Sequence, residues 1–358
     1  MQGALAVVLG TVAAGAGVGF GGPRFHSSGG DDLAGVLGLG GAVVGAVLVA
    51  GGVVLLTRAA PRWWRLLVAP VTVLGVALGV YVLAIPVVVT TAPRSPLGAT
   101  TPADVGLAYE DVRIVTAGEE ELAGWYVRSA NGAAVVVLHG SGSSRSGVVQ
   151  HVKVLAQHGY GVLALDARGH GASSGRAMRW GWYGDVDVPR AAMWLASRPD
   201  VDPARIAALG LSMGGEEAIG AAAQTDVIRA VVAVGVTGRS ADDLGWLSST
   251  YGWRGTLTRA VHAVQTSLAD VLAEPARPVP LDEAVREMAP RPVLLVAAGQ
   301  VADEQHASQA LHAAAPGTVR VWTVPGARHT GGLAAAPQQW ESQVVGFLDA
   351  ALAAPAGP

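Results

Sequence analysis

The sequence of 358 residues contains no cysteine and few charged residues, and both absences narrow its function. Without cysteine the chain has no disulfide, no cysteine-ligated zinc, no iron–sulfur cluster and no thiol nucleophile. Charged residues make up 14% of the chain, whereas an ordinary soluble domain has about 25%. The net charge is −3 with a single lysine, Lys153, and no basic tract, so we expect no nucleic-acid partner. At 51% hydrophobic residues, the chain is too apolar for intrinsic disorder.

The few charges are spread unevenly. Residues 1–100 contain only seven charged side chains, and they fall between or after three stretches that have none: Met1–Pro23, Leu33–Thr57 and Leu66–Thr91. A membrane-spanning helix needs about 20 apolar residues to cross about 30 Å of hydrocarbon. The sequence therefore predicts a membrane region at residues 1–97, with three helices and a proline-rich linker.

The arginine distribution predicts how these helices are oriented. Arg58, Arg62 and Arg65 lie in the short loop between the second and third stretches, and positive loops stay on the cytoplasmic side. We therefore expect a multi-pass protein of the cell membrane whose later residues are extracytoplasmic. The first stretch has the length of a signal peptide but lacks a basic amino-terminal region, so a retained helix is favoured.

Glycines at four-residue spacing accompany each apolar stretch. Such pairs allow two helix backbones to approach closely in lipid, so each pair is a candidate helix contact. The pairs are Gly15/Gly19, Gly41/Gly45 and Gly75/Gly79.

Residues 98–358 have an ordinary soluble composition and alternate between two patterns. Short apolar, β-branched runs alternate with helical patterns near residues 145–158, 184–198, 213–224, 303–315 and 336–353. The alternation predicts an α/β domain with helices on both faces of a mostly parallel sheet. A proline- and tryptophan-containing stretch, 239–288, interrupts the rhythm and is interpreted as a small helical insertion. The expected strands are 112–116, 122–127, 134–138, 162–166, 206–211, 230–236, 293–298 and 319–324.

One strand-to-helix turn contains a candidate nucleophile. Gly210-Leu211-Ser212-Met213-Gly214 follows an apolar run and precedes an alanine-rich helical pattern. In this G-x-S-x-G context the turn is so tight that its flanking positions must be glycine, and the serine hydroxyl is exposed at its tip. Ser212 is therefore the candidate nucleophile.

A serine hydroxyl needs a base that accepts its proton. His329 follows the last expected strand, where a side chain reaches the carboxyl edge of the sheet, at which ligands bind in open α/β sheets. The carboxylate that orients this imidazole should follow the strand 293–298. Asp303 is assigned that role, and the adjoining Glu304 is the alternative.

An acyl-transfer site also needs donors for a tetrahedral oxyanion. The backbone N–H of Met213, directly after the candidate nucleophile, is one expected donor. The second is the backbone N–H of Ser141 in the loop His139-Gly140-Ser141-Gly142, which follows the strand 134–138.

With these motifs, residues from about 105 onward resemble an α/β-hydrolase-fold serine hydrolase of the esterase, peptidase and dienelactone-hydrolase-like branches. The order Ser212, Asp303, His329 matches the family pattern. The resemblance also covers Asp166–Gly171 and Trp182–Asp185, and implies that His170 and Asp185 are structural. It implies an eight-stranded sheet and no metal or organic cofactor. It does not extend to residues 1–97.

The resemblance implies a serine hydrolase that cleaves an ester or amide bond through an acyl-enzyme intermediate, and the apolar stretches indicate that it is anchored in a membrane. Its substrate would be a small-molecule ester or amide, with lipid-like esters and peptides both open, and the lipid bilayer would be its other partner. Trp246, Tyr251 and Trp253 of the insertion are candidate walls of the acyl pocket or, equally, core residues of a lid. The alternative function is a catalytically silent binding module on the same fold, anchored in the membrane.

Overall fold

The computed structural model describes residues 1–28, 30–116 and 118–353. By their internal contacts they form two compact units. The helical unit comprises Met1–Pro93 and Ala260–Glu274, and the sheet unit comprises Arg94–Arg259 and Pro275–Pro358. The insertion expected at residues 239–288 is therefore divided between the two units.

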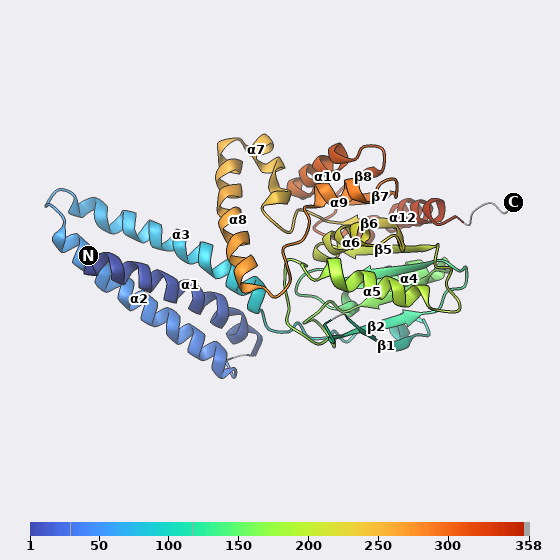
Figure 1. Ribbon diagram of the computed structural model, residues 1–358, viewed down its shortest axis with the longest axis horizontal. Helices are drawn as coiled ribbons and strands as arrows, with labels where there is room; N and C mark the ends of the chain where they lie inside the picture. The colour runs from blue at the N-terminus through green and yellow to red at the C-terminus, as the bar shows by residue number, and fades with distance from the viewer. Residues whose placement is uncertain (29, 117, 354–358) are drawn as a thin grey trace. The chain divides into compact units, whose positions relative to one another are not determined.

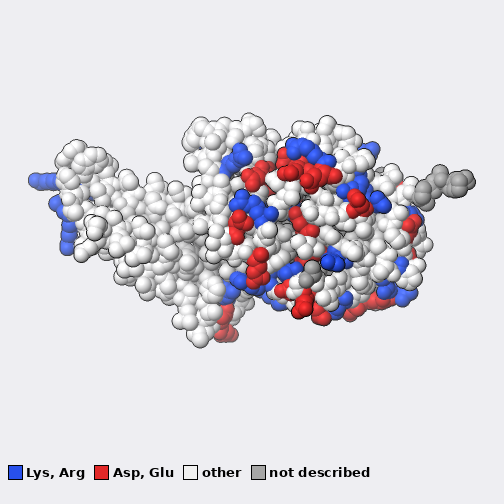
Figure 2. Space-filling model, in the orientation of Figure 1, with Lys and Arg blue, Asp and Glu red and all other residues white. Residues whose placement is uncertain are grey.

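The helical unit contains α1 (Gln2–Ser28), α2 (Leu33–Ala59) and α3 (Arg65–Thr91), which lie side by side (Figure 1). All three are long and apolar enough to cross a membrane. Many of their large apolar side chains are exposed, such as Leu37, Val47 and Leu74. Figure 2 shows Lys, Arg, Asp and Glu near the ends of these helices and nearly absent along them. This is the surface expected of helices that face lipid.

Close glycine contacts bring α1 and α2 together. Gly3, Gly10 and Gly17 follow one another at seven-residue spacing on α1, and each lies against the α2 backbone. A Cβ added at Gly10 would lie 2.6 Å from the carbonyl oxygen of Gly45, and one added at Gly17 would lie 2.5 Å from that of Gly38. Any larger residue at these positions would force the two backbones apart.

The glycine pairs expected from the sequence are used unevenly. Both members of Gly15/Gly19 contact α3. Gly45 contacts α1 whereas Gly41 has no atom near its Cβ position, and Gly79 contacts Thr11 whereas Gly75 again has none. Four-residue spacing therefore identified one complete contact out of three pairs.

The sheet unit is built on one eight-stranded sheet with the order β1-β2-β4-β3-β5-β6-β7-β8. Strand β2 is antiparallel to both β1 and β4, and all other neighbours are parallel. The mostly parallel eight-stranded sheet predicted from the apolar runs is confirmed. Its strands are β1 (Glu110–Val115), β2 (Glu121–Val127), β3 (Ala134–Leu138), β4 (Gly161–Leu165), β5 (Ile206–Leu211), β6 (Ile228–Val234), β7 (Val293–Ala298) and β8 (Val319–Val324).

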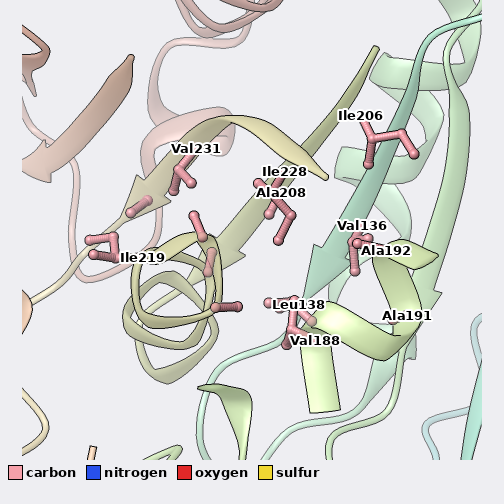
Figure 3. Close-up of a cluster of buried hydrophobic side chains, with 14 of the residues drawn as sticks. Val136, Leu138, Val188, Ala191, Ala192, Ile206, Ala208, Ile219, Ile228 and Val231 are labelled. Atoms are coloured by element: carbon pink, nitrogen blue, oxygen red, sulfur yellow. The ribbon is translucent and has the colours of Figure 1, made fainter. Parts of the chain in front are cut away.

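Helices cover both faces of this sheet. The core on one face includes residues of α5 (Gly184–Ala196), α6 (Met213–Gln224) and α9 (Leu281–Glu287), and the core on the other includes α4 (Val149–Gln157) and α12 (Pro337–Ala351). Figure 3 shows part of the first core, where Ile219 of α6 and Val188 of α5 lie over the sheet residues Val136 and Ala208. The strands are buried on both faces, which explains why they are continuous apolar runs.

Further helices follow the strands β6, β7 and β8. The insertion after β6 contains the short helix η3 (Asp242–Leu244), α7 (Trp246–Tyr251) and α8 (Trp253–Leu272). Helix α10 (Ala302–Ala314) follows β7, and α11 (Gly332–Ala335) follows β8.

Candidate active site

The sheet brings the sequence motifs to one edge. Strands β3 and β5 are parallel neighbours, with Leu138 opposite Gly210. Strands β7 and β8 are also parallel neighbours, with Ala298 opposite Val324. The loops that follow these four strands therefore begin at the same carboxyl edge, although β3 and β8 are separated by more than a hundred residues in the chain.

Ser212 occupies a strained turn between β5 and α6. Its backbone has φ 53° and ψ −120°, a region that non-glycine residues rarely adopt. A Cβ at Gly210 would overlap the carbonyl group of Gly214, and one at Gly214 would lie 2.7 Å from the carbonyl oxygen of His139. The two glycines are therefore required by close backbone approach, as the motif predicted.

His329 lies between the candidate nucleophile and a buried carboxylate. Its Nε2 is 3.0 Å from Ser212 Oγ, and its Nδ1 is 2.7 Å from Glu304 Oε1. The loop that carries it is tied to the end of β7, because Gly299 N–H donates to Val324 and Gln300 N–H donates to Ala327. Serine, imidazole and carboxylate thus form one hydrogen-bonded chain.

The carboxylate in this chain is Glu304, not Asp303. Asp303 is exposed, and its Oδ1 accepts a 2.6 Å hydrogen bond from the Tyr251 hydroxyl. Helix α10 begins at Ala302, so the two acids are successive helical residues and point about 100° apart. One of them faces the insertion, and the other faces the sheet and His329. The expectation for Asp303 is therefore corrected by the geometry in favour of the alternative.

A hydrogen bond and nearby negative charge favour the protonated form of the imidazole. The Glu304 side chain is fully buried, and the Ala298 N–H donates to its second oxygen at 2.8 Å. The hydrogen bond to Glu304 raises the pKa of His329 above its ordinary value, against the opposing effect of partial burial. The charges of Glu304 and Glu216 act in the same raising direction.

Glu216 is a second buried acid near the site that the sequence reasoning missed. Its Oε1 accepts the backbone N–H groups of Thr237 and Gly238, at the start of the insertion. Burial raises the pKa of Glu216 to about 7. The sequence could have indicated Glu216, because it lies in the first turn of α6, directly after the turn that contains Ser212. The first turn of this helix lies at the carboxyl edge of the sheet.

The two expected oxyanion donors lie beside Ser212. Met213 is the first residue of α6, so its N–H has no partner within the helix. On the other side, the loop after β3 approaches so closely that a Cβ at Gly140 would lie 3.4 Å from Ser212 Cβ. The backbone of Ser141 follows in that loop. The structure thus brings together the nucleophile and both loops, and the oxyanion role of the two amides stays a prediction.

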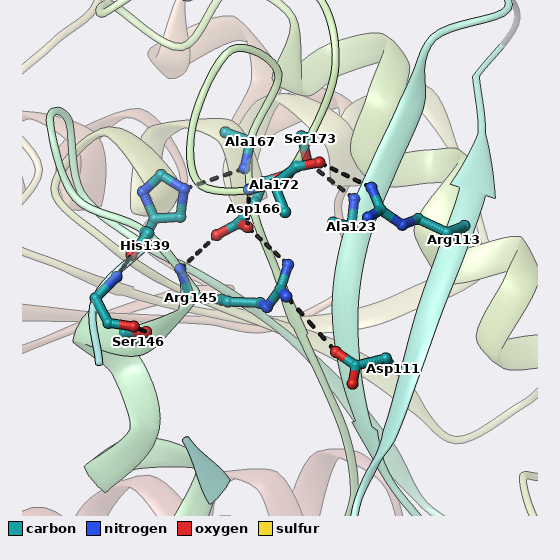
Figure 4. Close-up of polar contacts among 12 residues, drawn as sticks. Asp111, Arg113, Ala123, His139, Arg145, Ser146, Asp166, Ala167, Ala172 and Ser173 are labelled. Carbon is teal, nitrogen blue, oxygen red and sulfur yellow. Dashed lines mark hydrogen bonds and ion pairs between the residues drawn. The ribbon is translucent and has the colours of Figure 1, made fainter. Parts of the chain in front are cut away.

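A polar network holds the loop after β3 in place (Figure 4). Asp166 is fully buried and accepts the backbone N–H of Arg145 at 2.7 Å and the N–H of Ala172 at 2.8 Å, while pairing with the Arg145 guanidinium. His139 Nε2 accepts the N–H of Ala167. Burial lowers the pKa of His139 to about 4, so its imidazole stays neutral.

The residues that the resemblance marked as structural are bonded away from Ser212. His170 Nδ1 is 3.0 Å from the carbonyl oxygen of Arg168. Asp185 forms an ion pair with the fully buried guanidinium of Arg239. Neither side chain contacts Ser212 or His329, which agrees with a structural role.

The aromatic residues of the insertion differ in their surroundings. Trp246 is buried and stacks on His306 of α10, and Tyr251 contacts the same ring edge-on. Trp253 is 72% exposed. Trp246 also lines a cavity of about 320 Å³ between η3, α7, α9 and α10. Among the residues that the structure describes, no three His, Asp or Glu side chains are grouped as metal ligands would be.

Comparisons with known proteins agree with this fold. A family described as serine aminopeptidase, S33 matches residues 129–275, a range that contains Ser212 and ends before Glu304 and His329. An esterase of Pyrococcus furiosus aligns in structure with a TM-score of 0.57 at 24% identity, covering 73% of this chain and 97% of the esterase. The sheet unit therefore has the α/β-hydrolase fold, as the motifs indicated.

Curated relatives match a shorter stretch. An uncharacterized protein of Mycobacterium tuberculosis is 40% identical over 123 residues, which is 33% of this chain and 42% of that protein. A thiohydrolase of Aspergillus aculeatus is 30% identical over 135 residues, 35% of this chain and 41% of that protein. The chain thus matches less than half the length of these relatives. Together with the fold and the family match, they support a hydrolase.

Proposed function

We propose that this α/β-hydrolase-fold chain is a membrane-anchored serine hydrolase that cleaves an ester or amide bond through Ser212, His329 and Glu304. One observation carries the proposal: His329 Nε2 lies 3.0 Å from Ser212 Oγ while Nδ1 lies 2.7 Å from the buried Glu304. A carboxylate on Nδ1 holds the imidazole in the tautomer whose Nε2 accepts a proton.

The chemistry follows from these positions. His329 takes the proton of Ser212 as its oxygen attacks the carbonyl carbon of the substrate, and the Met213 and Ser141 amides stabilise the resulting oxyanion. The imidazolium then gives its proton to the departing alcohol or amine, which leaves an acyl group on Ser212. Water, deprotonated by the same imidazole, attacks this acyl-enzyme and releases the acid. Each step uses only groups of this chain and water.

The membrane part of the proposal is supported by α1, α2 and α3, each long and apolar enough to span a bilayer. Arg58, Arg62 and Arg65, at and beside the junction of α2 and α3, support a cytoplasmic position for that loop. The sheet unit then begins on the extracytoplasmic side.

A fluorophosphonate probe tests the enzyme and its orientation in one experiment, because it labels only an activated serine. Wild-type protein in membranes should be labelled, Ser212→Ala should lose labelling, and Ser197→Ala, a change at the exposed end of α5, should retain it. With a charged, membrane-impermeant probe, labelling of intact cells should match that of lysed cells.

Labelling that survives in Ser212→Ala would overturn the assignment of the nucleophile. A folded wild-type protein that is never labelled would favour the silent binding module. Labelling restricted to lysed cells would reverse the orientation.

A further inference from the structure

Helix α8 exposes a stripe of apolar side chains and buries two of its polar ones. Gln265, Thr266 and Ala269 are buried. The exposed face carries four large apolar side chains, which we call the α8 stripe: Trp253 (72% exposed), Leu257 (58%), Val264 (50%) and Val271 (83%). Their spacing of four, seven and seven residues places them on one side of the helix.

An exposed stripe of large apolar side chains is not what water selects. A surface helix of a soluble protein buries its apolar stripe and exposes its polar face. In a bilayer, apolar side chains face the lipid, and polar side chains turn inward to find hydrogen-bond partners. Gln265 follows the second pattern, because its side-chain N–H donates to the backbone carbonyl of Tyr81 at 3.4 Å.

The partner of α8 in that contact is itself a candidate membrane span. Residues 260–274 belong to the helical unit together with α3. The exposed surface of α3 is apolar as well, with Val71 66% and Leu74 73% exposed. Within this unit, Val264 and Val271 therefore add to a surface that already has the character of a lipid-facing one.

We propose that the α8 stripe is embedded in the lipid bilayer, so that the insertion is itself a membrane-contacting element. Charged side chains of α8, such as Arg254, Arg259 and Asp270, are exposed, and the long arginine side chains extend toward the polar headgroups. Lipid is the occupant that fits the stripe, since it requires no matching polar groups.

The base of the insertion is fixed to the sheet unit. Asp243 accepts the backbone N–H of Arg239 at 2.9 Å and that of Leu281 at 2.6 Å, which joins the two ends of the insertion. The Arg239 guanidinium pairs with Asp185 and donates to the carbonyl of Val279 at 2.9 Å. The insertion therefore leaves and re-enters the fold at one clamped point.

The amino-terminal end of α8 lies close in sequence to a contact with the catalytic helix. Tyr251, two residues before Trp253, bonds to Asp303, which adjoins Glu304 on α10. Resting on the proposed function, we take esters with long acyl chains as the substrate class, because a helix embedded in lipid brings the insertion to where such esters are dissolved.

The absence of cysteine allows a direct test in the full-length protein. Val264→Cys and Val271→Cys are each labelled with an environment-sensitive fluorophore and reconstituted in phosphatidylcholine–phosphatidylglycerol vesicles. Leu74→Cys on α3 is the lipid-facing control, and Gln338→Cys, exposed on α12, is the aqueous control. Doxyl-labelled lipids and aqueous iodide serve as the two quenchers.

The stripe positions should follow the Leu74 control, with quenching by doxyl lipids and protection from iodide. Quenching by iodide alone, as at Gln338, would overturn the proposal. Protection from both quenchers would also overturn it, because the stripe would then be covered by protein such as a second copy. None of these measurements requires catalytic activity, so their outcome does not depend on whether the proposed enzyme function is correct.

Activity tests the substrate class separately. The double change Val264→Asn and Val271→Asn should lower turnover of a long-chain ester in vesicles by about tenfold or more, since each lost valine burial is worth about that factor. Hydrolysis of soluble p-nitrophenyl acetate should be unchanged. Equal rates on both substrates in wild type and variant would refute the bilayer route.

Discussion

In the helical unit, glycine serves helix packing: Gly10 and Gly45 lie in straight α-helices, and their missing side chains let two backbones touch. In the sheet unit, glycine serves turns: Gly210 and Gly214 flank a residue with positive φ, and their missing side chains let a strand turn sharply into a helix. The helical contacts set the distance between two helices, whereas the turn sets the direction of one hydroxyl.

The difference predicts how each unit tolerates change. A helix interface made of repeated glycine contacts loses one contact when one glycine is replaced by a larger residue, so its stability decreases gradually. A catalytic site depends on a few atoms within hydrogen-bond reach, so one displaced or missing group abolishes most of its rate. The two units are therefore compared most clearly by single substitutions, each paired with a control substitution at a similar residue nearby.

The largest effect is expected in the sheet unit from Glu304→Gln. The amide cannot act as the charged acceptor on His329 Nδ1 and favours the wrong tautomer, so kcat should fall by about 10⁴. Asp303→Asn, one residue away, removes only the charge of an exposed group that accepts the Tyr251 hydroxyl and should change kcat by less than about threefold, since an exposed hydrogen bond is worth about 0.5 kcal/mol. Ester hydrolysis by both variants, purified in detergent, measures this difference.

Thermal unfolding of the two variants serves as the control. Glu304→Gln keeps the shape of the side chain and should remain folded. A larger loss of kcat in Asp303→Asn than in Glu304→Gln would restore Asp303 as the acid and contradict the structure.

A smaller effect is expected in the helical unit from Gly45→Ala. The added Cβ would lie 2.5 Å from Ala14 N and 2.6 Å from the Gly10 carbonyl oxygen, so α1 and α2 must separate at a cost of about 1–3 kcal/mol. Gly41→Ala is the matched control, because its Cβ meets no atom within 4 Å and alanine favours a helix over glycine by about 0.5–1 kcal/mol. Unfolding in detergent micelles against added denaturing detergent measures both.

Equal effects of the two alanine variants on stability would show that the close contact at Gly45 does not govern this unit. Since neither substitution touches the sheet unit, esterase activity of the folded fraction should be retained in both.

The sequence was most informative where a local rule decides the structure. Every strand of the sheet was predicted to within two residues, because buried parallel strands are uninterrupted apolar runs. Ser212 was singled out by its flanking glycines and His329 by its place after the last strand, and the two side chains lie 3.0 Å apart. These features depend on neighbours in the chain, which a sequence displays directly.

The features that were missed depend on which way a side chain turns. Asp303 and Glu304 are adjacent acids, and only the first residue of α10 decides which one faces His329. Gly41 and Gly45 look alike in sequence, but only one faces α1. The exposed apolar stripe of α8 was not predicted either. Residues 239–288 were expected to form one insertion, and the sequence does not show that Gln265 is buried and Val271 exposed.

The smallest effect expected is a shift of pH dependence, and it too belongs to the sheet unit. The pKa of His329 is raised above 6.5, chiefly by its hydrogen bond to Glu304. Because the base must be neutral, kcat/KM should fall as the pH drops through this raised pKa, so the acidic limb of wild type lies above pH 6.5. Removing the carboxylate in Glu304→Gln lowers the pKa, and the residual activity should have its acidic limb at lower pH.

Glu216→Gln sharpens this test. The amide oxygen still accepts the Thr237 and Gly238 amides, whereas the charge that helps to raise the pKa of His329 is lost. Burial raises the pKa of Glu216 to about 7, so part of its charge is absent near neutral pH. The acidic limb should therefore move down by less than in Glu304→Gln. An upward shift, or a shift larger than that of Glu304→Gln, would mean that the imidazole depends on Glu216 rather than on Glu304.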